Sequence, residues 1–236
     1  MDDLRSGLDL NMALGHQQLM MSFGGAGLAL PTANLINDWN PDTLVGVLAD
    51  NDPVSTLGND STGGDFTQSG SARPIFKENI INGHAVLRFD GSDDWMLTTD
   101  PTALRGVFTI FVVCKGDVAA PGMVFGGPSL RYCWLRDNQI EVYFGGGFLS
   151  NTTTANNVWN HYVITSDDTT LKVFQNGTEV INTTDASAQW QAEQLGRYGG
   201  GLYFDGDIAR IGDYSDCKTG GDLTALFDAL DAIYGL

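Results

Sequence analysis

The sequence predicts an all-β protein, an antiparallel β-sandwich of jelly-roll type, and three observations carry that prediction. Short segments rich in β-branched and aromatic residues recur roughly every ten residues after residue 84, with turn residues between them. Glycine accounts for 30 of the 236 residues, and only four of the 29 acidic residues are glutamate, so turn formers outnumber helix formers. A helical apolar period with capping signals occurs at the C-terminal end of the chain.

The chain is predicted to begin with an arm, residues 1–33, that precedes one sandwich domain, residues 34–236. Leu4, Leu8 and Leu14 form a loose apolar stripe at helical spacing, and a glycine-rich stretch follows it. Such a short and weakly capped helix is marginal in isolation. We therefore expect these three leucines to attach the protein to another surface. The alternative, in which residues 1–30 fold back onto the same domain, stays open.

Turn residues dominate residues 34–82, and strand patterns strengthen after them. VFTIFVVCK, residues 107–115, is β-branched and aromatic enough for a buried central strand. Asn176-Gly177 predicts a type I′ hairpin turn, because both residues readily adopt positive φ. The other predicted strands are HAVLRFD (84–90), DWMLTT (94–99), MVFG (123–126), RYCWLRD (131–137), QIEVYFG (139–145), HYVITSD (161–167), TLKVFQNG (170–177) and EVINTT (179–184).

The last segment predicts a short C-terminal helix that closes the edge of the sandwich. Apolar residues from Leu223 to Tyr234 share one helical face, Asp222 is placed to cap the helix, and Gly235 to end it. Trp159 and Tyr162 are expected to anchor the core of the sandwich, and Gly206 to allow a close backbone approach.

Charge and composition exclude several classes of partner. The net charge is −17 with only 12 basic residues, which disfavours nucleic acid and anionic membranes. No apolar stretch is long enough for a membrane span, and the acidic start is unlike a signal peptide. Three cysteines without a C-x-x-C spacing predict neither a disulfide framework nor a zinc site.

Four segments together resemble laminin-G-like domains of the concanavalin A-like lectin/glucanase superfamily. They are NGHAVLRFDGSDDWM (82–96), FTIFVVCK (108–115), VWNHYVITSDDTTLKVFQNGTEV (158–180) and LGRYGGGLYFDGDIARIGDYS (195–215). The resemblance spans about residues 35–236 and implies a concanavalin A-like jelly roll.

The same resemblance raises the question of glycoside hydrolysis, and the sequence argues against it. Glycosidases use two carboxylates about 5–9.5 Å apart. The four glutamates are scattered along the chain, no two acids alternate within a predicted strand, and no nucleophile motif such as G-x-S-x-G occurs. We therefore expect a protein that is not an enzyme.

Two kinds of binding site remain as candidates. Trp134, Trp190 and Tyr198 lie in or near predicted loops and could stack on sugar rings. Laminin-G-like domains often hold calcium at the rim of the sandwich, and calcium prefers six to eight oxygen ligands. The acids nearest the family motifs, and hence the candidate calcium ligands, are Asp90, Asp93, Asp205 and Asp207, with Asp94 beside them.

Chains of this pattern resemble the laminin-G-like proteins of tailed bacteriophages. The resemblance implies a non-enzymatic structural protein of the virion, such as a head decoration, fibre or tail component, made in the host cytoplasm. Its expected partners are other virion proteins of the capsid or tail, further copies of itself and host surface glycans. The alternatives are a bacterial carbohydrate-binding module and a degraded glycosidase.

Overall fold

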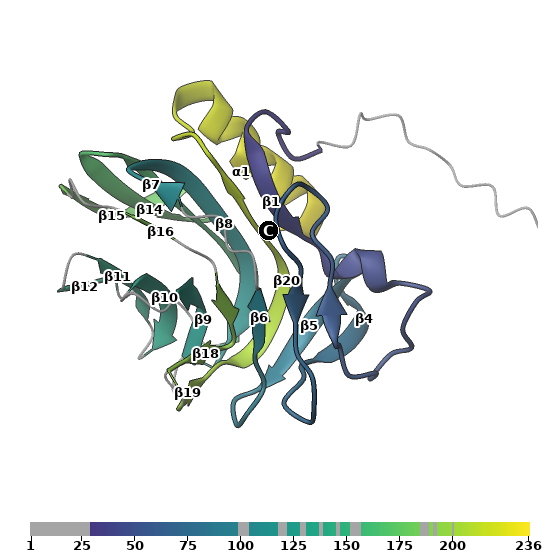
Figure 1. The fold of residues 1–236 in the computed structure, drawn as a ribbon. Helices are drawn as coiled ribbons and strands as arrows, with labels where there is room; N and C mark the ends of the chain where they lie inside the picture. The colour runs from purple at the N-terminus through teal and green to yellow at the C-terminus, as the bar shows by residue number, and fades with distance from the viewer. Residues whose placement is uncertain are drawn as a thin grey trace, which may run out of the picture.

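Two eight-stranded antiparallel sheets make up most of the protein, which we describe from a computed structural model (Figure 1). The structure describes residues 29–98, 104–117, 122–127, 131–136, 139–144, 147–151, 157–184, 189–190, 193–199 and 201–236. The strands of the first sheet are β1 (Leu35–Trp39), β4 (Ile75–Ile81), β5 (His84–Asp90), β8 (Val107–Gly116), β13 (Asn160–Asp167), β14 (Thr170–Gln175), β15 (Thr178–Thr184) and β20 (Asp205–Tyr214). Their order is β15-β14-β13-β8-β20-β5-β4, with β1 paired to β20.

The second sheet has the order β12-β11-β10-β9-β17-β6-β3-β2. Its strands are β2 (Thr56–Leu57), β3 (Phe66–Thr67), β6 (Met96–Thr98), β9 (Gly122–Gly127), β10 (Arg131–Arg136), β11 (Gln139–Phe144), β12 (Gly147–Asn151) and β17 (Gln194–Leu195). Two small ribbons pair β7 (Leu104–Arg105) with β16 (Gln189–Trp190) and β18 (Arg197–Tyr198) with β19 (Leu202–Tyr203). The short 3-10 helix η1 (Pro41–Leu44) and the helix α1 (Gly220–Tyr234) complete the described elements.

The predicted β-sandwich is confirmed, including its central strand and its tight hairpin. β8 pairs with both β13 and β20 in the middle of the first sheet. Asn176 and Gly177 have φ values of 46° and 75° between β14 and β15, as a type I′ turn requires. Gly206 is also confirmed as a close approach, because a Cβ atom there would lie 2.7 Å from Gly116 Cα on β8.

Two strands of the first sheet, β1 and β4, were missed by the sequence analysis. β1 carries Asn37 and Asp38, which look like turn residues but are buried with partners. Asn37 donates to both carboxylate oxygens of Asp213 at 2.9 Å. Asp38 accepts from Arg210 Nε at 2.7 Å. β4 is irregular, with Asn79 at a φ of 53°, and this irregularity hides its strand pattern.

The main core lies between the two sheets, and Tyr162, which is 1% exposed, belongs to it as predicted. The prediction for Trp159 is wrong, because this side chain is only half-buried and lies outside that core. Among the tryptophans whose side chains the structure describes, Trp39 belongs to the main core. It is 1% exposed, its ring lies 4.5 Å from that of Phe66, and its Nε1 donates to Gly64 O at 2.9 Å.

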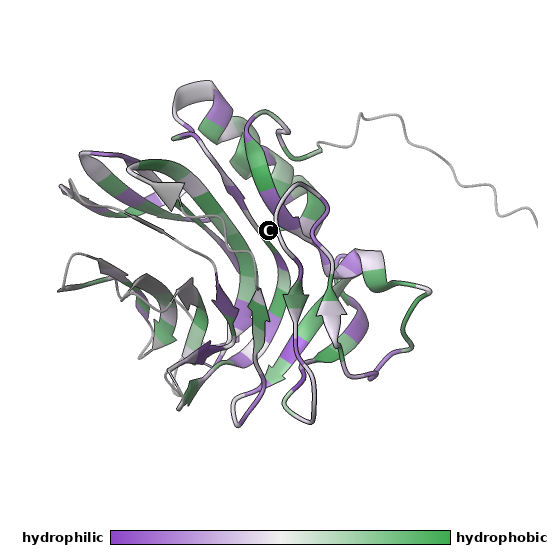
Figure 2. Ribbon diagram, in the orientation of Figure 1, coloured by the Kyte–Doolittle hydropathy of each residue, from purple (hydrophilic) through white to green (hydrophobic). Residues whose placement is uncertain are grey.

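Helix α1 covers the outer face of the first sheet rather than an edge of the sandwich, so that prediction is wrong (Figure 1). Its buried residues Leu226, Ala229, Leu230 and Tyr234 join a second core with residues of β5, β8, β13, β14 and β20. Figure 2 shows apolar residues along the central strands and on the helix that covers them. Thr219, not Asp222, occupies the N-cap position, and Gly235 ends the helix at a φ of 71° as predicted.

The three candidate attachment leucines, Leu4, Leu8 and Leu14, lie outside the described residues. The last residues of the predicted arm are described, and they contact the domain. Leu30 is 6% exposed within the core under α1, and Lys218 Nζ donates to Ala33 O at 2.9 Å. The described chain therefore begins against the outer face of the first sheet.

Two further predictions concern cysteines and membranes. Cys114 and Cys133 are buried free thiols in the main core, and burial raises the pKa of both well above the ordinary value. Within the ranges that the structure describes, no helix has the length and hydropathy needed to cross a membrane.

Candidate functional site

The outer face of the second sheet carries a cluster of aromatic side chains, which we call the aromatic patch: Trp134, Tyr143, Phe148 and Tyr198. Strand alternation places Trp134 there, because Cys133 and Leu135 on either side of it point into the main core, and Tyr198 joins it from the β18-β19 ribbon. The rings of Trp134 and Tyr198 are 5.7 Å apart, those of Trp134 and Phe148 6.0 Å, and those of Tyr143 and Phe148 4.8 Å. These separations are typical of interacting aromatic pairs.

Exposure differs sharply within the aromatic patch. Trp134 is 4% exposed and lies underneath, whereas Phe148 is 49% exposed and Tyr143 and Tyr198 are half-buried. A sugar ring can therefore reach Phe148, Tyr143 and Tyr198, while Trp134 supports them from below. Phe148 thus keeps about half of its surface exposed although burial of such a ring is favourable.

The structure thus brings two predicted carbohydrate-binding residues, Trp134 and Tyr198, into one cluster. Trp190 lies in β16, and its side chain is outside the described part of the chain. The sequence analysis missed Tyr143 and Phe148. They lie directly opposite each other on β11 and β12. The sequence analysis did not predict β12, so it could not recognise the two residues as a cross-strand aromatic pair.

One glutamate shares the outer face of the second sheet with the aromatic patch. Glu141 is 5% exposed and lies opposite Trp134 across β10 and β11. The other three glutamates are in different segments: Glu78 in β4, Glu179 in β15 and Glu193 beside β17. Glu141 therefore lies buried beside Trp134, beneath the exposed rings of the patch.

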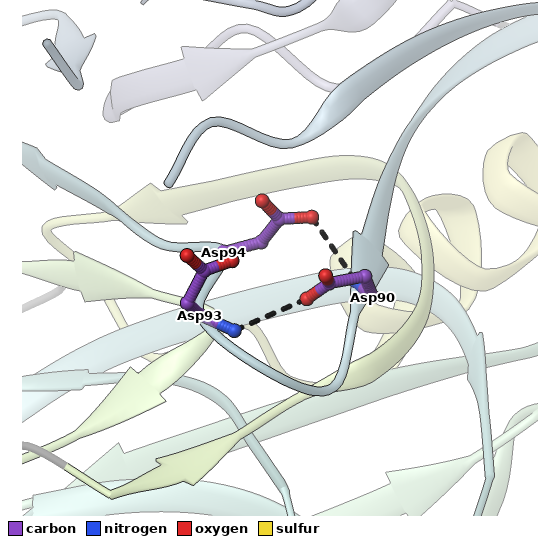
Figure 3. Close-up of side chains that lie close together, drawn as sticks. All are labelled: Asp90, Asp93 and Asp94. Carbon is purple, nitrogen blue, oxygen red and sulfur yellow. Dashed lines mark hydrogen bonds between the residues drawn. The ribbon is translucent and has the colours of Figure 1, made fainter. Parts of the chain in front are cut away.

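A second candidate site is the acidic turn between β5 and β6, which holds Asp90, Asp93 and Asp94 (Figure 3). One carboxylate oxygen from each lies within 4.8 Å of the others. Asp90 Oδ1 accepts from Ser92 N at 2.8 Å and from Asp93 N at 3.2 Å, and Asp94 Oδ2 accepts from Asp90 N at 3.1 Å. Gly91 makes the turn possible, with a φ of 71°.

Several carboxylates lie close together in and beside this acidic turn, and the charged forms of Asp94 and Asp205 are disfavoured. Asp94 is 5% exposed, and its burial, together with the negative charge of Asp90, raises its pKa to about 7. Asp205 lies opposite Asp90 across β5 and β20, and its pKa is also raised, first by burial and then by Asp117 and Asp90. Carboxylate oxygens are the ligands that calcium prefers, so Asp90, Asp93 and Asp94 are the residues that would hold such an ion.

The four predicted calcium ligands do not all meet. Asp90 and Asp93 lie together with Asp94 in the acidic turn, and Asp90 and Asp94 also line a cavity of about 340 Å³ with Asp205 and Asp207. Asp207 is buried in an ion pair, with Arg88 Nε at 2.7 Å, Arg88 Nη2 at 2.9 Å and Lys115 Nζ at 3.3 Å. Two cations already balance Asp207, so it acts as part of the scaffold.

Solved structures similar to this protein are lectin-like sandwich domains of larger proteins. Trypanosoma rangeli sialidase matches with a TM-score of 0.58 and 16% identity, over 87% of this chain and 34% of that one. The receptor-binding domain of botulinum neurotoxin type G matches with a TM-score of 0.56 and 12% identity, over 84% and 52% of the two chains. At such identities the likeness shows the fold alone, and the chain spans only about a third of the sialidase.

A further similar structure has the size of a single domain. Domain 4 of AbnA, a GH43 extracellular arabinanase from Geobacillus stearothermophilus solved with arabinotriose, matches with a TM-score of 0.55 and 14% identity. The match covers 84% of this chain and 98% of that one. A search of curated protein sequences found no match.

A comparison with models of protein families shows the family of this chain. The model of a laminin G-like family, described as concanavalin A-like lectin/glucanases superfamily, matches residues 81–223, which is more than half of the chain. That stretch holds the acidic turn and all four residues of the aromatic patch. The chain belongs to the laminin G-like family of the concanavalin A-like lectin/glucanase superfamily.

Proposed function

We propose that this protein is a non-enzymatic glycan-binding domain whose binding surface is the aromatic patch. The observation that carries the proposal is the exposure of Phe148, 49%, on top of a packed aromatic cluster. Sugar rings present apolar C–H faces that stack on such side chains. The lectin-like fold of the family is consistent with this role.

The experiment compares binding of immobilised glycans by the full chain and by two variants. Phe148→Ala removes the exposed ring and should weaken binding about tenfold, in line with the energy of stacking on an aromatic ring. Val158→Ala is the matched control. Val158 is also 49% exposed, but it lies just before β13 of the first sheet, outside the aromatic patch. Full binding by Phe148→Ala, or equal loss in both variants, would contradict the proposal.

The absence of catalysis is part of the proposal. Glycoside hydrolysis needs two carboxylates at a set separation, whereas the described glutamates lie in four different segments. Incubation with β-glucan or agarose should release no reducing ends above a boiled control. Release that disappears in Glu141→Gln would reassign the patch as an active site.

We further propose that the domain is a structural part of a bacteriophage particle, where it would contact capsid or tail proteins, copies of itself and host glycans. The resemblance to phage-encoded laminin-G-like proteins and the apolar stripe of Leu4, Leu8 and Leu14 support this. Mass spectrometry of purified virions tests it, with the protein expected at stoichiometric abundance. Its absence from particles would favour the alternative of a bacterial carbohydrate-binding module, for which the domain-sized arabinanase neighbour is the supporting observation.

A further inference from the structure

A pocket of about 550 Å³ opens at the β6-β3-β2 end of the second sheet, apart from the aromatic patch. Its volume lies in the range of about 300–1,000 Å³ usual for small-molecule sites. Phe66 and Met96 point into the main core, so by strand alternation their neighbours Thr67, Trp95 and Leu97 face outward. The pocket-lining residues used below are Thr67, Gln68, Arg73, Trp95 and Leu97.

Buried hydrogen-bond donors in this pocket lack partners. Gln68 Nε2 and Arg73 Nε are shielded from solvent and have no acceptor among the described residues. Such donors are costly to leave unsatisfied, about 1–3 kcal/mol each and more when charged. Gln68 and Arg73 both line the pocket, so a ligand that presents acceptor oxygens there would meet both side chains.

A second guanidinium group, that of Arg197, adds positive charge to this region. The Arg197 guanidinium carbon lies 3.4 Å from the centroid of the Trp95 ring, and Arg197 Nε is also buried without an acceptor among the described residues. The described residues of the pocket lining include no aspartate or glutamate, in a chain with a net charge of −17. Arg73 in the lining, Arg197 on the Trp95 ring and a described lining without carboxylates favour an anionic ligand at this point of an acidic surface.

We propose that this pocket binds the charged unit of an acidic polysaccharide, with the anionic group on Arg73 and Gln68 and the sugar ring beside Trp95. The proposal rests on the glycan-binding function proposed above and gives it a ligand class. Consecutive residues connect the two surfaces, because Arg197 contacts Trp95 and Tyr198 contacts Trp134. One polysaccharide chain can therefore lie across the outer face of the sheet from the pocket to the aromatic patch.

Calorimetric titration of the full chain with two pairs of probes tests this. One pair is trimeric oligogalacturonate and its neutral methyl ester, and the other is a carrageenan tetramer and its desulfated form. The two pairs distinguish a carboxylate from a sulfate as the anionic group. In at least one pair, the charged saccharide should bind at least tenfold more tightly than its neutral counterpart.

Two pocket variants and one control test whether the preference for the charged saccharide arises in the pocket. Arg73→Gln removes the charge, and Gln68→Glu is nearly isosteric but places a carboxylate in the pocket. Each should weaken binding of the charged saccharide at least tenfold and leave binding of the neutral one unchanged. Lys172→Gln removes the same single charge from β14, in the other sheet, and should change affinity less than twofold. If Arg73→Gln does not fold, as judged by its melting curve, Gln68→Glu alone decides the question.

The outcomes separate this inference from the proposed function. Equal affinity for charged and neutral saccharides, or equal loss in Lys172→Gln, overturns the acidic-ligand pocket. If neutral saccharides bind and only Phe148→Ala weakens them, the glycan-binding function stands without the pocket. If neither charged nor neutral saccharides bind, both proposals fail.

Discussion

His161 Nε2 on β13 lies 3.0 Å from Asp231 Oδ1 on α1 and joins the outer helix to the first sheet. The imidazole is fully buried, and its ring stacks on Phe227 at a centroid distance of 5.7 Å. His84 forms a similar bond on the same side of the molecule, with its Nδ1 2.6 Å from Asp42 Oδ2. Both histidines therefore hold structural contacts.

The His161 contact predicts how stability depends on pH. Burial lowers the pKa of His161 below the ordinary value of 6.5, although Asp231 opposes the shift. Because the unfolded chain binds the proton more readily, the contribution of His161 is fully present above pH 6.5 and is lost as the pH falls below it. The stability advantage of the natural protein over His161→Gln should therefore shrink between pH 7 and pH 5. Urea melts measure this, and a gap that is constant with pH would contradict it.

Core substitutions should separate Trp39 from Trp159. Trp39 is 1% exposed and hydrogen-bonded, so Trp39→Ala should cost about 3–5 kcal/mol from lost burial and the cavity left behind. Trp159 is half-buried beneath Lys115, whose Nζ lies 5.3 Å from the ring centroid, so Trp159→Ala should cost about half as much. Denaturant melts of the two variants measure the loss in free energy of unfolding. A greater loss in Trp159→Ala than in Trp39→Ala would contradict the prediction.

Calcium should stabilise the protein through the acidic turn. An ion at 100 times its Kd adds about 2.7 kcal/mol, or roughly 5–10 °C in Tm for a domain of this size. In chelator, the raised pKa of Asp94 means that stability is lost as the pH rises through about 7, and calcium should remove that loss. Asp94→Asn should abolish the calcium response, whereas Asp228→Asn on the exposed side of α1 should keep it. An unchanged Tm with calcium at pH 8 would show that the turn is only structural.

Two truncations should show that the two parts of the predicted arm differ in function. The boundary between the parts lies just before Ala29, where the described chain begins. Removal of residues 1–28 should leave the Tm nearly unchanged, but binding to the particle or to other copies should be lost with Leu4, Leu8 and Leu14. Removal of residues 1–33 also deletes Leu30, which is 6% exposed, and should cost about 2–3 kcal/mol. Thermal melts and sedimentation measure both effects, and assembly by the shorter chain would place attachment on the sandwich itself.

The sequence predicted most of the fold because its main signals are local. Segments rich in β-branched and aromatic residues identified β5, β8 and β13, and Asn176-Gly177 identified a hairpin, without knowledge of distant contacts. β1 was missed because Asn37 and Asp38 become compatible with burial only through Asp213 and Arg210, more than 170 positions away. The position of α1 on a sheet face, rather than an edge, likewise depends on which surface the strands leave uncovered.

The candidate sites were less predictable than the fold for the same reason. Trp134 and Tyr198 were proposed separately, and only the pairing of strands shows that they share a cluster with Tyr143 and Phe148. Asp207 had the residue type of a calcium ligand, but Arg88 and Lys115 lie against it from neighbouring strands. Residue type along the chain does not reveal such neighbours across a sheet.

The central claim is that the outer face of the second sheet binds glycans. The most direct test is nuclear magnetic resonance of the isotope-labelled protein during titration with a saccharide that binds in the experiments above. The account predicts that amide shifts concentrate around Tyr143, Phe148 and Tyr198, while those of α1 on the opposite side of the sandwich stay unchanged. Shifts that instead concentrate on α1, or on the half-exposed groove beside Trp159, would contradict it.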